Sequence, residues 1–150
     1  MTKTPTRTKK FYYRRVSWQS KDKSTLEKML KDAHSQFKTA GERTFLKTDG
    51  EVQGASYKIE DKHRGIYLHI GVCKPGESAS VIDGDKTLVE SNTDEHPAPE
   101  GKEFLDGEIF AYVRKNHIIF CTTNLQETIL KFYLRKVLGK CGFAAIVVVN

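Results

Sequence analysis

The residues of this 150-residue chain that could do chemistry are its histidines, cysteines and acids, and none of them forms a catalytic pattern. The five histidines show no H-x-H, H-x-x-x-H or H-E-x-x-H spacing, so they do not predict a metal site. The glycine-rich loops that hold nucleotide phosphates, G-x-x-x-x-G-K-[ST] and G-x-G-x-x-G, are also missing from the sequence. The sequence therefore predicts no catalytic residue, no metal and no cofactor.

Two groups of residues suggest weaker alternatives. A metal-dependent nuclease needs converging carboxylates with a lysine about two residues after one of them. Asp106 and Glu108 are the best pair of acids, but their lysine would be Lys115, at the far end of the same predicted hairpin. Cys121 precedes a predicted helix, which could lower its thiol pKa, yet no histidine is placed to act as a base. We interpret Cys121 as structural and keep the nuclease as a third hypothesis.

The clearest chemical signal is a combination of cationic and aromatic residues. Residues 9–15 have the sequence KKFYYRR, and residues 131–136 have the sequence KFYLRK. Lysine and arginine bind phosphates and aromatic rings stack on exposed bases, so the combination suits nucleic acid. The alternative is that Phe11, Phe132 and Tyr133 are core residues with charged neighbours in solvent. The candidate nucleic-acid-binding residues are Lys9, Lys10, Arg14, Arg15, Lys131, Arg135 and Lys136.

Charge is unevenly distributed along the chain, whose net charge is +6. Residues 1–15 carry six bases and no acid, residues 49–108 carry fourteen acids and six bases, and residues 109–150 carry six bases and one acid. A cluster of bases releases counterions from a polyphosphate, whereas interspersed charges cancel at a distance. The basic ends therefore favour a nucleic-acid partner, although basic surfaces also simply keep a domain soluble.

The elements that position these residues follow from hydrophobic periodicity. Ser24-Thr-Leu-Glu27 has the form of a capping box and precedes apolar residues at helical spacing. Helices are predicted before Gly41 and over residues 125–138, the second with a capping box at residues 123–126. Strands are predicted over residues 11–18, 44–47, 51–59, 65–74, 107–122 as a hairpin, and 144–149 as a strand buried on both faces. Residues 75–106 hold nine of the 19 acids and predict a long irregular segment with at most one short edge strand.

This order predicts an α+β fold, a two-layer sandwich with two helices on one face of a mostly antiparallel sheet. A ferredoxin-like variant with extra strands is the expected topology. Residues 1–8 have no apolar residue beyond Met1 and predict a flexible basic arm, followed by a single α+β domain over residues 9–150. Because the sequence ends just after its most apolar strand, we expect either the N-terminal domain of a longer protein or a strand lent to a partner.

The layout resembles the N-terminal region of RexA-like prophage exclusion proteins, part of the bacterial phage-defence repertoire. The similarity lies in an early aromatic strand, a capped helix, and the hairpin GEIFAYV and NHIIF within residues 107–120 that leads into an amphipathic helix. The resemblance implies a DNA-binding or assembly module of a defence system. It assigns a role to no individual residue.

The first functional hypothesis is a non-enzymatic nucleic-acid-binding module, with DNA favoured, that uses the basic arm and the basic C-terminal helix. The second is a protein-interaction domain that forms a homo-oligomer or docks on a partner protein through opposed charge surfaces. No apolar run approaches the ~18 residues of a membrane span, and the N-terminus lacks the apolar stretch of a secretory signal. The sequence therefore predicts a cytoplasmic protein with no membrane contact.

Overall fold

The computed structural model describes residues 6, 8–18, 24–48, 50–60, 62, 64–142 and 146–149. The elements are, in chain order, β1 (Tyr12–Trp18), α1 (Leu26–Gln36), a short 3-10 helix (Gly41–Arg43), β2 (Thr44–Lys47), β3 (Gly50–Ile59), β4 (Ile66–Cys73), β5 (Ser78–Ile82), β6 (Thr93–Pro97), β7 (Leu105–Arg114), β8 (His117–Thr123), α2 (Glu127–Lys140) and β9 (Ile146–Val149). The larger sheet has the order β2-β3-β4-β7-β8-β1-β9, and every neighbouring pair is antiparallel. The mixed α/β class with a mostly antiparallel sheet is therefore confirmed.

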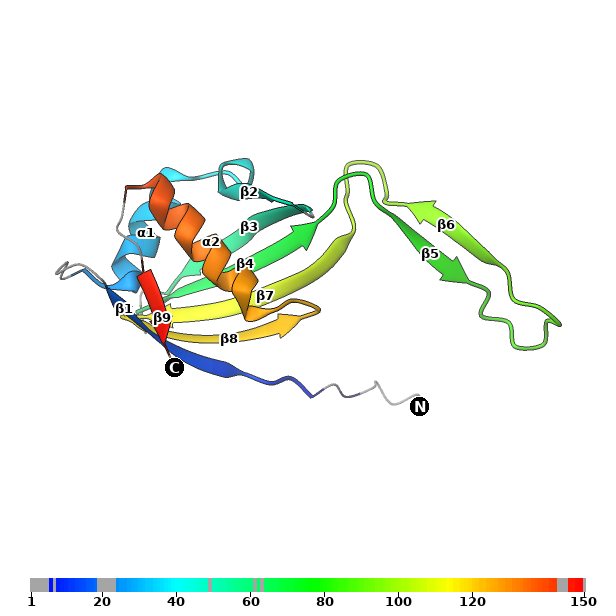
Figure 1. Ribbon diagram of the computed structural model, residues 1–150, viewed down its shortest axis with the longest axis horizontal. Helices are drawn as coiled ribbons and strands as arrows, with labels where there is room; N and C mark the ends of the chain where they lie inside the picture. Colours follow the sequence, from blue (N-terminus) through cyan, green and yellow to red (C-terminus); the bar gives the residue numbers. More distant parts are fainter. Residues whose placement is uncertain are drawn as a thin grey trace.

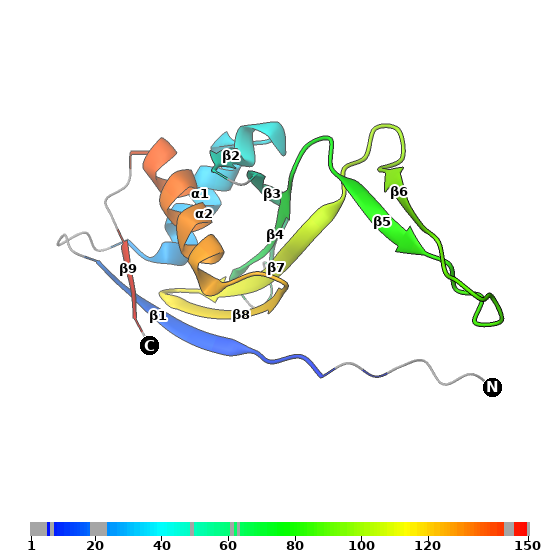
Figure 2. The same cartoon turned by 45° about the vertical axis from the view of Figure 1, so that its right-hand side comes forward.

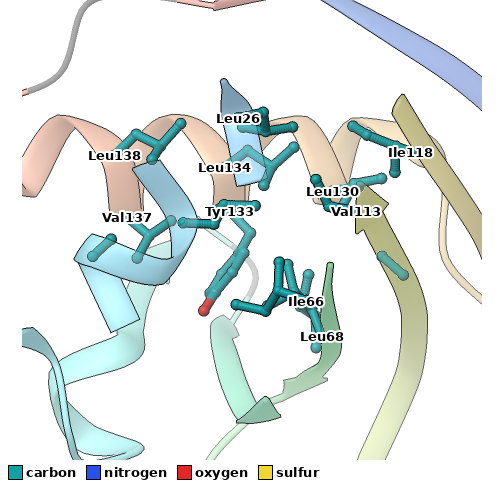
Figure 3. Close-up of a cluster of buried hydrophobic side chains, with 14 of the residues drawn as sticks. Leu26, Ile66, Leu68, Val113, Ile118, Leu130, Tyr133, Leu134, Val137 and Leu138 are labelled. Atoms are coloured by element: carbon teal, nitrogen blue, oxygen red, sulfur yellow. The ribbon is translucent and has the colours of Figure 1, made fainter. Parts of the chain in front are cut away.

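Both helices lie on the concave side of the curled sheet (Figures 1 and 2). Their apolar stripes meet alternate side chains of the strands, because successive side chains of a strand point to opposite faces. Figure 3 shows this core, with Tyr133 of α2 beside Ile66 and Leu68 of β4. Burying these side chains is the main favourable contribution to folding, roughly 1.5–3 kcal/mol for each large one.

The helix starts differ from the predicted capping boxes. Thr25, not Ser24, is the N-cap of α1, and its hydroxyl accepts a hydrogen bond from the backbone N–H of Lys28. Glu27 does not reach back to the cap, because its carboxylate accepts from the backbone N–H groups of Gly65 and Lys115 instead. The N-cap of α2 is Gln126, which makes no side-chain capping bond, so the capping box predicted at residues 123–126 is wrong.

The acidic middle of the chain is more regular than predicted. Strands β5 and β6 pair with each other in a separate two-stranded sheet and form, with the residues between them, what we call the acidic hairpin, residues 78–97. Figures 1 and 2 show this hairpin extending away from the larger sheet. The prediction of at most one edge strand in this segment is therefore wrong, because the two short strands satisfy each other's backbone groups without help from the rest of the sheet.

The last strand was predicted to be buried on both faces or lent to a partner. In the part of the chain described, β9 pairs within its own chain with β1, antiparallel, at the edge of the larger sheet. The predicted burial of its two faces stays a prediction, because the burial of these side chains lies outside what the structure describes. The predicted arm, residues 1–8, lies outside the described residues except for Thr6 and Thr8. Among the helices that the structure describes, none is long and apolar enough to cross a membrane.

Candidate functional site

The sheet has a second face that the helices do not use. Along β4, Ile66, Leu68 and Ile70 are buried on the helix side, whereas Tyr67 and His69 alternate with them and are exposed or half-buried. We call the face that carries Tyr67 and His69 the outer face. The same alternation continues on β7, β8 and β1, so the outer face is lined by a second set of side chains from four adjacent strands.

The strand register arranges these side chains in cross-strand rows. Two rows are mainly aromatic and one is mainly cationic. The first aromatic row consists of Lys58, Tyr67, Tyr112, Ile119 and Tyr13. The second aromatic row lies beside the first and consists of Ser56, His69, Phe110 and Cys121. The cationic row is Arg114, His117 and Arg15. Rings and positive charges therefore run side by side across the outer face.

Neighbouring rings in the aromatic rows contact one another. The ring centroids of Tyr67 and Tyr112 are 4.6 Å apart, and those of His69 and Phe110 are 4.3 Å apart with the rings nearly parallel. Phe110 nevertheless remains 42% exposed. Contacts of this kind hold the rings in place while leaving aromatic surface open to a further ring.

A groove lies over the aromatic rows. Its volume is about 370 Å³, and its walls come from β3, β4, β7, β8 and Phe11. The side chain of Phe11 is 68% exposed. The volume falls in the range of roughly 300–1,000 Å³ that is typical of ligand sites, so the groove can accept a planar, largely apolar group.

Polar contacts fix the edges of this surface. The Lys9 ammonium lies 5.9 Å from the ring centroid of Phe110 and donates a hydrogen bond to the Thr123 hydroxyl, with 3.4 Å between Nζ and Oγ1. The Tyr13 hydroxyl and Nδ1 of His117 are 2.6 Å apart and hydrogen-bonded. These contacts hold a lysine and a tyrosine at the margin of the aromatic rows, where they can face a ligand that lies across the rings.

The structure separates the predicted nucleic-acid-binding residues. Lys9 and Arg15 lie on the outer face, and Lys10 is an exposed neighbour of Lys9. Arg14 points to the other side and forms an ion pair with Glu127, with 2.7 Å between Nη2 and Oε1. The Arg14 guanidinium lowers the pKa of the Glu127 carboxyl below its usual value. Because Arg14 forms this ion pair, we interpret it as a structural residue and not as a contact to nucleic acid.

The three cations of α2 are on the helix side of the sheet. Lys131 lies 3.6 Å from the carboxylate of Glu127, one helical turn earlier. Arg135 donates to the backbone carbonyl of Lys131, and Lys136 lies over the ring of Phe132. The fold therefore does not bring these residues together with Lys9 and Arg15.

The aromatics of the two basic segments divide in the same way. Tyr133 is fully buried and Phe132 packs against the core, as the core interpretation predicts. Phe11 is exposed, so for this residue the core interpretation is wrong. The larger set of outer-face aromatics was missed because Tyr67, Phe110 and Tyr112 stand singly among apolar residues. Their alternation with buried isoleucines and valines was the signal that could have found them.

The histidines, acids and cysteine that could act in metal binding or catalysis have structural contacts or are buried. Nε2 of His69 donates to the carboxylate of Glu108, with 2.8 Å between the atoms. The neighbouring Asp106 carboxyl raises the pKa of the Glu77 carboxyl. Cys121 is buried. Among the residues that the structure describes, no group of three or more histidines, cysteines and acids could hold a metal ion.

Comparison with protein-family models, with curated proteins and with solved structures finds no match.

Proposed function

We propose that this chain is a non-enzymatic module that binds single-stranded nucleic acid across the outer face of its larger sheet. The observation that carries the proposal is the pair of aromatic rows, with a groove above them and a cationic row beside them. An open sheet whose aromatic side chains stack on unpaired bases is a recurrent way to bind single strands. Stacking of this kind needs bases that are free of a partner strand, which favours single strands over duplexes.

The contacts assign different parts of the strand to different residues. Bases stack on the exposed rings of Phe110, Tyr67 and Tyr13, while Lys9 and Arg15 contact phosphates. Neither type of contact reads a base edge, so binding has little sequence preference. Because phosphate contacts release counterions, affinity falls steeply as salt concentration rises.

The finer architecture supports this assignment. We infer a two-layer, ferredoxin-like arrangement in which β9, β1, β8 and β7 are the four basic strands and β2, β3 and β4 are the extra ones. The support is the strand order, in which β1 lies between β8 and β9 while α2 connects those two strands. With both helices on one side, the other side of the four basic strands is left for a ligand.

The biological setting is carried by the sequence resemblance alone. We propose, on that basis, that DNA is the ligand and that the module works in the cytoplasm as part of a phage-defence system. Parallel titrations with single-stranded DNA and RNA of one sequence test the choice of nucleic acid.

The proposal is tested by Phe110→Ala. Stacking of one base on an aromatic side chain contributes about 1–3 kcal/mol, so the variant should bind a fluorescent single strand roughly 5- to 150-fold more weakly. The variant should fold normally, since Phe110 is 42% exposed. Fluorescence anisotropy at low salt measures the affinity. Unchanged affinity in a folded variant would refute the outer face as the site.

Self-association is the second candidate function, and the acidic hairpin is the observation that favours it. Residues 78–97 carry five acids and one lysine, and they leave Val81, Ile82 and Val89 exposed. Opposite charge favours docking of this hairpin on the cationic surfaces of a second copy, and the exposed apolar side chains add contact area. This candidate would use the hairpin, whereas nucleic-acid binding would use the outer face.

A further inference from the structure

A basic pocket lies at the end of the sheet where the turns after β3 and β7 meet the start of α1. It has a volume of about 400 Å³. Five cations and one carboxylate line it, namely Lys28, Lys31, Arg64, Arg114, Lys115 and Glu27. The cations come from three separate segments of the chain, so no single stretch of sequence reveals the cluster.

Glu27 holds the pocket together. Its carboxylate accepts hydrogen bonds from the backbone N–H groups of Lys115, at 2.8 Å, and Gly65, at 3.2 Å, and from the Lys31 ammonium, at 2.8 Å. Burial alone would raise the pKa of Glu27, but these donors outweigh it and lower the pKa. The carboxylate is therefore ionised at neutral pH and fixes both turns against α1.

Most of the positive charge in the pocket is not neutralised by an acid among the described residues. Lys31 is the cation that pairs with Glu27. Within the described residues, Lys28, Arg64, Arg114 and Lys115 form no ion pair with an acid. Four cations held close together with no described acid beside them repel one another, and an anion bound among them would relieve that repulsion.

The pocket is continuous with the outer face. Arg114 lines the pocket and also begins the cationic row that continues through His117 to Arg15. The hydroxyl of Tyr112, in an aromatic row, donates to the backbone carbonyl of Arg64 at 2.8 Å. A strand lying on the rings would thus reach the pocket with one of its ends.

We propose that the basic pocket binds the terminal phosphate of the single strand whose bases stack on the outer face. The proposal rests on the proposed function above. A phosphate monoester carries a charge of about −1.5 to −2 near neutral pH, more than an internal phosphodiester, and offers three strongly accepting oxygens. Several unpaired cations from different directions match such a group better than they match a single diester.

The test compares strands of one sequence that carry a 5′-phosphate, a 3′-phosphate or no terminal phosphate. A phosphate at one of the two ends should increase the affinity several-fold in anisotropy titrations. The double variant Lys28→Ala/Arg64→Ala should abolish that increase and leave binding of the unphosphorylated strand nearly unchanged. The matched control, Arg135→Ala/Lys136→Ala, removes the same two residue types from α2 and should keep the increase.

A second measurement uses the unaltered protein and inorganic phosphate. Titration followed by NMR should shift the backbone amide signals of Gly65 and Lys115, whose N–H groups donate to the Glu27 carboxylate that lines the pocket. No shift at these amides, equal affinity for all three strands, or an increase that survives Lys28→Ala/Arg64→Ala would each overturn the pocket proposal. If the unphosphorylated strand still binds and Phe110→Ala weakens it, the proposed function stands while the pocket proposal falls. If no strand binds, both fall.

Discussion

Three polar side chains are buried between the helices and the sheet, and each of them is hydrogen-bonded within the protein. Nδ1 of His34 donates to the carbonyl of Leu30, so Nε2 of the neutral ring accepts from the Tyr133 hydroxyl at 3.0 Å. Arg43 donates to the carbonyls of Gly54 and Phe37. Because each of the three side chains is hydrogen-bonded to a described residue and the outer face is on the other side of the sheet, we interpret this cluster as a structural network.

Stability should fall at mildly acidic pH because of His34. Burial lowers the pKa of His34 below its usual 6.5, and the Arg43 charge lowers it further, while the bond to Leu30 opposes this. Below about pH 6.5 His34 becomes protonated in the unfolded chain but stays neutral in the folded chain. The free energy of unfolding therefore decreases by up to about 1.4 kcal/mol for each pH unit by which the pH falls. The decrease continues until the pH reaches the lowered folded-state pKa.

Urea denaturation at several pH values measures this dependence, and His34→Gln serves as the comparison. Glutamine does not titrate, so the variant should lose the part of the pH dependence that belongs to residue 34. Identical pH dependence in the two proteins would show that His34 does not carry it. Tyr133→Phe provides a further check, since it leaves Nε2 of His34 without a donor and should cost about 1–3 kcal/mol.

Two adjacent tyrosines give a matched test of the outer face. Tyr12 and Tyr13 are 41% and 49% exposed but point to opposite sides of β1. Tyr13→Ala should weaken single-strand binding by about 1–3 kcal/mol, whereas Tyr12→Ala should leave it nearly unchanged. Anisotropy titrations at a temperature where both variants are folded measure the difference. Equal losses for the two variants would argue that affinity does not come from the outer face.

Some of these residue positions could be predicted from the sequence and some could not. Alternation in residues 66–72 predicts which side chains of β4 are buried, since burial depends on local periodicity. The cap of α1 and the partners of Glu27 were not predictable, because Glu27 bonds to Gly65 and Lys115, which are distant in sequence. The basic pocket was missed for the same reason.

The same contrast between local and distant information holds for whole elements. The helix before Gly41 and the hairpin of β7 and β8 were predicted well, because periodicity and turn residues are local signals. The prediction that α2 binds nucleic acid used only its local mixture of cations and aromatics. That prediction could not take account of the sheet, which lies between α2 on one side and Lys9 and Arg15 on the other.

Two matched charge reversals decide which element contacts the strand. Lys9→Glu/Arg15→Glu changes a lysine and an arginine on the outer face, and Lys136→Glu/Arg135→Glu changes the same types on α2. The outer-face pair should weaken binding and lower the salt slope by about 1 for each lost phosphate contact. The α2 pair should have a much smaller effect. If the α2 pair has the larger effect, the prediction from the sequence that α2 binds nucleic acid is correct and the outer face is not the binding site.

At the scale of the whole molecule, the fold separates many of the acids of the sequence from its main clusters of cations. Five acids of the middle segment are carried by the acidic hairpin, which extends away from the sheet. The cations of the outer face and the basic pocket remain near the body of the domain. An acidic body that projects away from a basic one favours contact between two copies, because the hairpin of one copy can reach the cations of another more easily than its own.

Removing the acidic hairpin tests this arrangement. Replacing residues 78–97 with a short glycine-serine link should leave the melting temperature nearly unchanged, since β5 and β6 pair with each other and not with the larger sheet. The complete chain should self-associate at low ionic strength and dissociate as the Debye length falls from about 10 Å at 0.1 M salt to about 3 Å at 1 M. The shortened chain should stay monomeric throughout and bind single strands more tightly at low salt, since no hairpin then competes for the cations. Light scattering across a salt series, with and without an oligonucleotide, measures both effects. If the unshortened chain is monomeric at low salt, docking of one copy on another is excluded and nucleic-acid binding remains the proposed function of the outer face. If the chain associates tightly and the association survives high salt, the contact is made by the exposed apolar side chains of the hairpin and not by its charge.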